Sequence, residues 1–112
     1  MYEVIRRLRM RSKKLYALRL LDNVNANNAV ESAREISEIL RRICIVKYPA
    51  AAVLLGRNWV DFLNSHCKKN LAAKTAQFLI DAPYMPLKST IYSNEDVESL
   101  KNFCREWIGE NL

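Results

Sequence analysis

The chain has 112 residues, half of them hydrophobic, with only two glycines and three prolines, which is the size and composition of one folded domain. Scarce turn residues exclude hairpin-rich sandwiches and barrels and favour helices, and no apolar run approaches the roughly 20 residues that cross a bilayer. The net charge of +6 resides in residues 1–21, and the rest of the chain carries equal numbers of acidic and basic side chains.

Residues 2–21 are predicted to form a basic first helix. Its apolar positions recur with helical spacing, at Val4, Ile5, Leu8, Leu15, Leu18 and Leu21. The candidate basic surface flanks this stripe and consists of Arg6, Arg7, Arg9, Arg11, Lys13 and Lys14. Such a surface suits nucleic-acid phosphates, an acidic protein or an anionic membrane, and the alternative is a solvated helix face. Aromatic residues for base stacking are limited to Tyr2 and Tyr16, which disfavours a single-strand binder.

A second helix is predicted after Asn28, which forms a capping box with Glu31, and it should end near Tyr48 because Pro49 follows. Its inner stripe consists of Ala29, Val30, Ala33, Ile36, Leu40 and Ile43. Its outer face consists of Glu31, Arg34, Glu35, Glu38, Arg41 and Arg42. The charged positions predict a solvated outer face.

Residues 49–66 are predicted to form a central hydrophobic helical region. The segment is apolar almost all round, which is typical of a buried helix. Gly56 and Asn58 leave two possibilities open. Either they divide the region into two short helices with Asn58 as a cap, or one helix runs through Gly56 at a cost of about 1 kcal/mol relative to alanine.

A fourth helix is predicted from Leu71 to Asp81, with Leu71, Phe78 and Leu79 facing inward and Pro83 beyond its end. Residues 83–93 then form an apolar connector that contains two prolines. Its large apolar side chains are the candidate partner-binding residues Tyr84, Met85, Leu87, Ile91 and Tyr92. Exposed residues of these types suit a partner surface, whereas the alternative is a chain that crosses the bundle and covers its core.

The C-terminal helix is predicted over residues 94–108. Ser93 and Asp96 form a second capping box, and Gly109 is a natural stop signal. The inward positions are Val97, Leu100, Phe103, Cys104, Trp107 and Ile108.

The sequence gives no motif for catalysis, metal or cofactor binding. Cys44, Cys67 and Cys104 have no paired spacing, which favours unlinked thiols and a reducing, cytosolic or nuclear compartment. His66 adjoins Cys67, but neighbours on a helix point about 100° apart, so they do not form a chelate or a nucleophile–base pair. Phosphate-binding glycine motifs are absent from the sequence.

These patterns predict a compact all-α domain over residues 1–112, built as an orthogonal bundle of five to six helices. The predicted function is a non-enzymatic protein–protein interaction module, either a helical adaptor or a subunit of a larger assembly. The alternative is a nucleic-acid-associated domain that binds the phosphate backbone through the basic first helix.

Overall fold

The computed structural model describes residues 13–24 and 28–112. Within these ranges the chain forms helices and loops without a strand, which confirms the predicted all-α class. We call the helical residues 13–22 the N-terminal helix. The later elements are α2 (Ala29–Lys47), the 3-10 turn η1 (Pro49–Val53), α3 (Gly56–Ser65), α4 (Ala73–Asp81), the 3-10 turn η2 (Ala82–Tyr84) and α5 (Asn94–Asn111).

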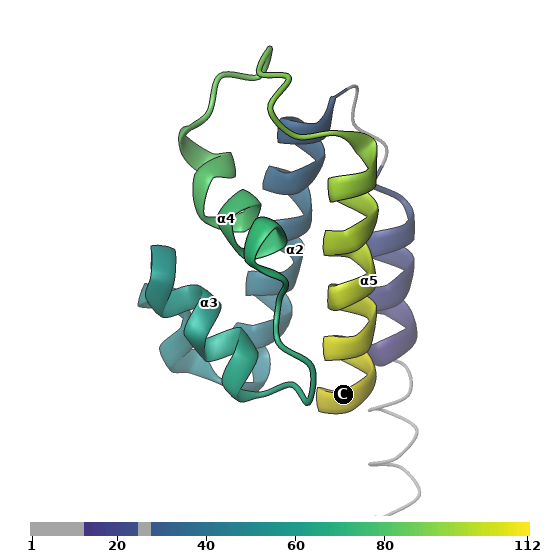
Figure 1. Ribbon diagram of the computed structural model, residues 1–112. Coiled ribbons are helices and arrows are strands. Elements are labelled where there is room, and N and C mark those ends of the chain that lie inside the picture. Colours follow the sequence, from purple (N-terminus) through teal and green to yellow (C-terminus); the bar gives the residue numbers. More distant parts are fainter. Residues whose placement is uncertain (1–12, 25–27) are drawn as a thin grey trace, which may run out of the picture.

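The helices form two groups. The N-terminal helix, α2 and α5 lie side by side along one direction, while α3 and α4 lie obliquely against them (Figure 1). The central element is α2, since it contacts α4, α5 and both 3-10 turns. No helix in the described part of the chain has the length and apolar character needed to cross a bilayer.

Both predicted boundaries of α2 are confirmed. The Asn28 side chain accepts a hydrogen bond from the Glu31 backbone N–H at 2.8 Å, which caps the helix start. At the other end the Tyr48 N–H donates to the Cys44 carbonyl, and Pro49 occupies the first turn of η1. The predicted inner stripe is buried apart from Ile43, which is half-buried and packs against the core.

Residues 49–66 divide into two short helical elements, which confirms one of the two predicted alternatives, but the predicted burial of the whole region is wrong. The chain divides at Leu54 and Leu55, and Gly56 starts α3 with φ of +54°, a left-handed conformation that favours glycine. Asn58 is not the cap, because Leu55 occupies that position. The division leaves Val53 and Leu55 exposed, so α3 is an amphipathic helix at the edge of the bundle and not its centre.

Arg41 joins η1 to α2, which corrects its predicted place on a solvated face. The side chain is half-buried, and its Nη1 donates to the carbonyls of Ala51 at 2.9 Å and Leu54 at 2.6 Å. Its guanidinium also lies over the Trp59 ring, 4.2 Å from the centroid. The apolar segment after α2 is therefore held by an arginine that the charge pattern assigned to solvent.

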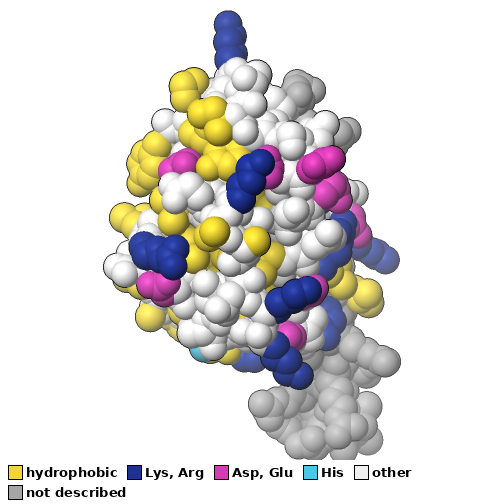
Figure 2. Space-filling view, in the orientation of Figure 1, with side chains coloured by type: hydrophobic (Ala, Val, Ile, Leu, Met, Phe, Trp, Pro, Cys, Tyr) yellow, Lys and Arg dark blue, Asp and Glu magenta, His cyan; other side chains and the backbone are white. Residues whose placement is uncertain are grey.

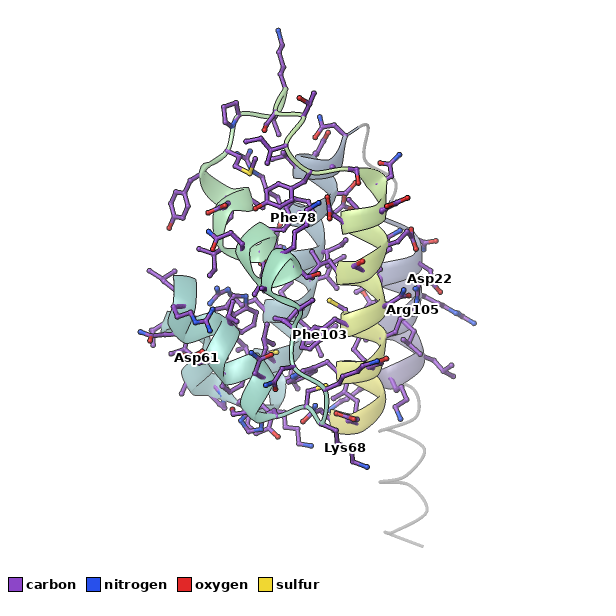
Figure 3. All side chains as sticks on the ribbon, in the orientation of Figure 1. Asp22, Asp61, Lys68, Phe78, Phe103 and Arg105 are labelled. Atoms are coloured by element: carbon purple, nitrogen blue, oxygen red, sulfur yellow. The ribbon has the colours of Figure 1, made fainter. Side chains whose placement is uncertain are left out.

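The fourth helix and the last helix meet in the core. Leu71, Phe78 and Leu79 are buried as predicted, although α4 begins at Ala73. Phe78 of α4 and Phe103 of α5 both point into the bundle interior (Figure 3).

Helix α5 has the predicted capping box, in which the Asp96 carboxylate accepts from the Ser93 backbone N–H at 2.8 Å. The predicted end at residue 108 is wrong, because the helix continues through Gly109 to Asn111. The Asn111 amide donates to the carbonyls of Trp107 at 2.9 Å and His66 at 2.8 Å. These bonds anchor the last turn, so Gly109 stays in the helix.

Candidate interaction surface

A shallow groove lies between the N-terminal helix and the C-terminal half of α2, and we call it the hairpin groove. Its volume is about 200 Å³. Its lining residues come from both helices and the chain end, and they are Lys13, Tyr16, Ala17, Leu20, Arg42, Ile43, Val46 and Leu112. Two antiparallel helices therefore present one continuous, mostly apolar surface.

The helical spacing of the sequence builds this groove. On the N-terminal helix Tyr16 and Leu20 are one turn apart, and the small, buried Ala17 lies between them on the side facing the core. On α2, Ile43 and Val46 continue an apolar row beside the core stripe. Tyr16 and Val46 are 65% and 66% exposed, an unusual state for two large apolar side chains that share one groove.

The groove has a cationic edge. Lys13 lies on one wall and Arg42 on the other, and the described lining residues include no acidic side chain. Arg42 pairs with Glu38 at 2.6 Å, but both side chains are exposed, so this pair contributes little and can exchange for another carboxylate.

The predicted partner-binding residues of the connector divide into two groups. Tyr84 and Ile91 are 78% and 74% exposed, and Leu87 is also exposed. Met85 is half-buried and packs against the core. On the face drawn in Figure 2, apolar side chains gather over the connector and the adjoining end of α4. Part of the connector therefore offers apolar surface to solvent.

Tyr92 was predicted to belong to the partner surface, and the structure contradicts this. It is 8% exposed, and its ring stacks on Phe78 with centroids 4.2 Å apart. Its hydroxyl donates to the Asp81 carboxylate at 3.2 Å. Burial, followed by this hydrogen bond, raises the pKa of Tyr92. The residue closes the core and is not available to a partner.

Arg34 fixes the start of the connector. The charge pattern of the sequence placed Arg34 on the solvated face of the second helix, and the structure corrects that prediction. Its Nε donates to the Ala82 carbonyl at 2.8 Å and its Nη2 to the Met85 carbonyl at 2.6 Å. These bonds satisfy the carbonyls of the first residue of η2 and of the residue that follows η2. The connector is thus packed down at both ends, by Arg34 and by Tyr92, with exposed side chains between them.

Most of the predicted basic surface lies outside the described residues, namely Arg6, Arg7, Arg9 and Arg11. Lys13 is exposed at the edge of the hairpin groove. Lys14 is half-buried and donates to the Gly109 carbonyl at 3.1 Å. Lys14 therefore helps to hold the N-terminal helix on α5.

The three cysteines and His66 pack against neighbouring side chains. Cys44 and Cys104 are buried; burial raises the pKa of Cys44 to about 12 and also raises the pKa of Cys104. Burial, then a hydrogen bond to Glu110, raises the pKa of Cys67. The His66 ring packs against Tyr48, 4.2 Å between centroids. Protonated thiols are weak nucleophiles and poor metal ligands. Within the described ranges no three candidate metal ligands lie together.

The sequence interpretation missed Tyr16 and Val46. The signal that points to Val46 is an apolar row on α2 that extends the predicted core stripe from Ile43 to Val46, and both residues line the groove beside the N-terminal helix. A row that widens the apolar face of a helix predicts a second packing partner.

A family model described as a domain of unknown function (DUF4381) matches residues 1–110, so the chain belongs to the DUF4381 family. Comparison with curated proteins and with solved structures gave no match.

Proposed function

We propose that this member of the DUF4381 family is a non-enzymatic protein-interaction module, acting as a helical adaptor or as a subunit of a larger assembly. The observation that carries the proposal is the hairpin groove, where the exposed Tyr16 and Val46 lie together on the surface. Aromatic residues supply a large contact area at protein interfaces, and contiguous exposed apolar surface marks binding sites. The exposed side chains of Tyr84 and Ile91 form a second candidate surface.

The size of the groove favours a protein over a small molecule. Pockets that hold small-molecule ligands span roughly 300–1,000 Å³ and enclose most of the ligand. The hairpin groove has about 200 Å³ and is open to solvent, room for one or two apolar side chains. The three free cysteines support a reducing compartment, and we propose a cytosolic or nuclear location.

Affinity capture of the full chain with matched variants tests this function. The double variant Tyr16→Ser/Val46→Ser removes the apolar groove side chains, and Tyr84→Ser/Ile91→Ser removes a comparable pair from the connector. All four side chains are exposed, so both variants should keep the fold. We expect a defined set of proteins to be captured after nuclease treatment, lost with the groove variant and retained with the connector variant.

The reverse result assigns the interaction to the connector instead of the groove. Capture that survives both double variants, or that disappears with nuclease, contradicts the proposed function. The second case favours the nucleic-acid alternative, which is supported by the concentration of the net positive charge in residues 1–21.

A further inference from the structure

We propose that the hairpin groove binds one face of an amphipathic helix whose flanking side chains are acidic. This inference rests on the proposed function and names the class of partner. It begins from the geometry of the two walls. The N-terminal helix and α2 run antiparallel (Figure 1). Each contributes apolar residues one turn apart to the seam between them. Such a seam has room for one or two of the side chains that form the i, i+3, i+4 and i+7 apolar row of a third helix.

Polar contacts away from the groove hold its walls in place. The N-terminal helix is joined to α5 by an ion pair of 3.0 Å between Asp22 and Arg105, which face each other in Figure 3. At its other end Lys14 donates to the Gly109 carbonyl. Lys47 of α2 donates to the Asn111 carbonyl at 2.6 Å. Both walls are therefore fixed to α5, and a partner helix meets a preformed surface, which lowers the entropic cost of binding.

The charge of the groove selects among helices. Lys13 and Arg42 lie on opposite walls, and the described lining residues include no acidic side chain; Arg42 has one carboxylate partner outside this lining, the exposed Glu38 one turn earlier on α2. A bound helix with glutamate on both sides of its apolar face places an acidic side chain beside each cation. A helix with lysine there brings like charges together, which is unfavourable.

The same charges disfavour a second copy of this chain. In a two-fold dimer that joins groove to groove, each patch meets itself, so Lys13 and Arg42 would face Lys13 and Arg42. A partner of opposite charge is the better match.

Two synthetic helical peptides of about four turns provide the test. Both carry leucine at the same i, i+3, i+4 and i+7 positions; one has glutamate and the other lysine along the flanks. Fluorescence anisotropy with the full chain measures affinity, and amide chemical-shift changes locate the site. We expect the acidic peptide to bind about tenfold more tightly at low salt, from two exposed charge pairs at about 0.2–1 kcal/mol each. The difference should shrink with added salt.

Charge reversal makes the test specific. Lys13→Glu/Arg42→Glu should weaken the acidic peptide and strengthen the basic one by about tenfold. The control Arg57→Glu/Lys88→Glu changes net charge equally at exposed positions outside the groove and should alter both affinities equally and little. Tyr16→Ser/Val46→Ser should abolish binding of the acidic peptide.

The inference is overturned if neither peptide binds, if the basic peptide binds as well as the acidic one, or if the groove reversal does not exchange their affinities. It is also overturned if phosphatidylserine vesicles bind through Lys13 and Arg42 and displace the acidic peptide. If captured proteins still depend on Tyr16 and Val46 in any of these cases, the interaction function holds and only the acidic helix is wrong.

Discussion

Arg41 and Arg42 are neighbours in the chain and have opposite surroundings. The Arg41 side chain is half-buried, bonds two carbonyls after η1 and covers the Trp59 ring. The Arg42 side chain is exposed and pairs only with Glu38 among the described residues. A helical pattern places both residues on the charged side of α2, because it gives only the direction of a side chain around the helix axis. It does not show which later segment packs against that side. The structural role of Arg41 was therefore beyond the sequence pattern.

We expect Arg41→Ala to lower the free energy of unfolding by about 2–3 kcal/mol, because it removes hydrogen bonds from a charged donor and leaves the Ala51 and Leu54 carbonyls without that partner. Arg42→Ala is the matched control and should change it by about 0.5 kcal/mol or less. Urea unfolding followed by far-ultraviolet circular dichroism measures both. Equal effects for the two variants would contradict the role assigned to Arg41.

At the scale of the elements, the sequence was most informative where capping residues mark a boundary. Asn28 and Ser93 are side-chain signals at helix starts, and Pro49 is a backbone signal after a helix end; all three lie where predicted. For residues 49–66 the division into two short helices was one of two open alternatives, and the predicted burial was wrong because hydrophobicity alone does not distinguish a buried helix from a divided segment with exposed apolar side chains. The decisive feature there is a single backbone angle at Gly56.

The two glycines give a paired prediction. Gly56 has φ of +54°, so Gly56→Ala should destabilise the protein by about 1–2 kcal/mol, although a Cβ there meets no neighbouring atom within 4 Å. Gly109 lies inside α5, where a Cβ also meets nothing within 4 Å, so Gly109→Ala should stabilise it by about 0.5–1 kcal/mol. Thermal unfolding should show shifts of opposite sign. A stabilising Gly56→Ala would show that this backbone angle is not required.

At the scale of the whole molecule, the hairpin groove arises from how three helices combine. Tyr16 and Val46 are 30 positions apart, and each alone looks like an ordinary position on its helix. Their common exposure follows because the N-terminal helix and α2 are both fixed to α5 while one side of their seam stays open. A sequence pattern can predict that α2 packs on two sides, but not that Val46 stays exposed at the seam with the N-terminal helix.

The charge of the whole molecule separates the proposed function from its alternative. If the chain binds duplex DNA, affinity should fall with salt at a log–log slope of about −0.9 per phosphate contact. The variant Arg7→Gln/Arg11→Gln/Lys13→Gln should then flatten that slope by two to three units, on the same principle. Lys13 is the better choice than Lys14, which already bonds the Gly109 carbonyl, so the fold should survive.

The control Arg42→Gln/Lys68→Gln/Lys88→Gln removes the same charge from exposed positions outside residues 1–21. We expect little or no binding to random duplex at about 0.15 M salt, because screening reduces surface attraction at that ionic strength and the remaining chain has no net charge to add. Fluorescence anisotropy of labelled duplex over a salt series measures this. Sub-micromolar binding at that salt, lost in the first variant and kept in the control, would contradict the proposed interaction module and show that the protein is a nucleic-acid-binding domain.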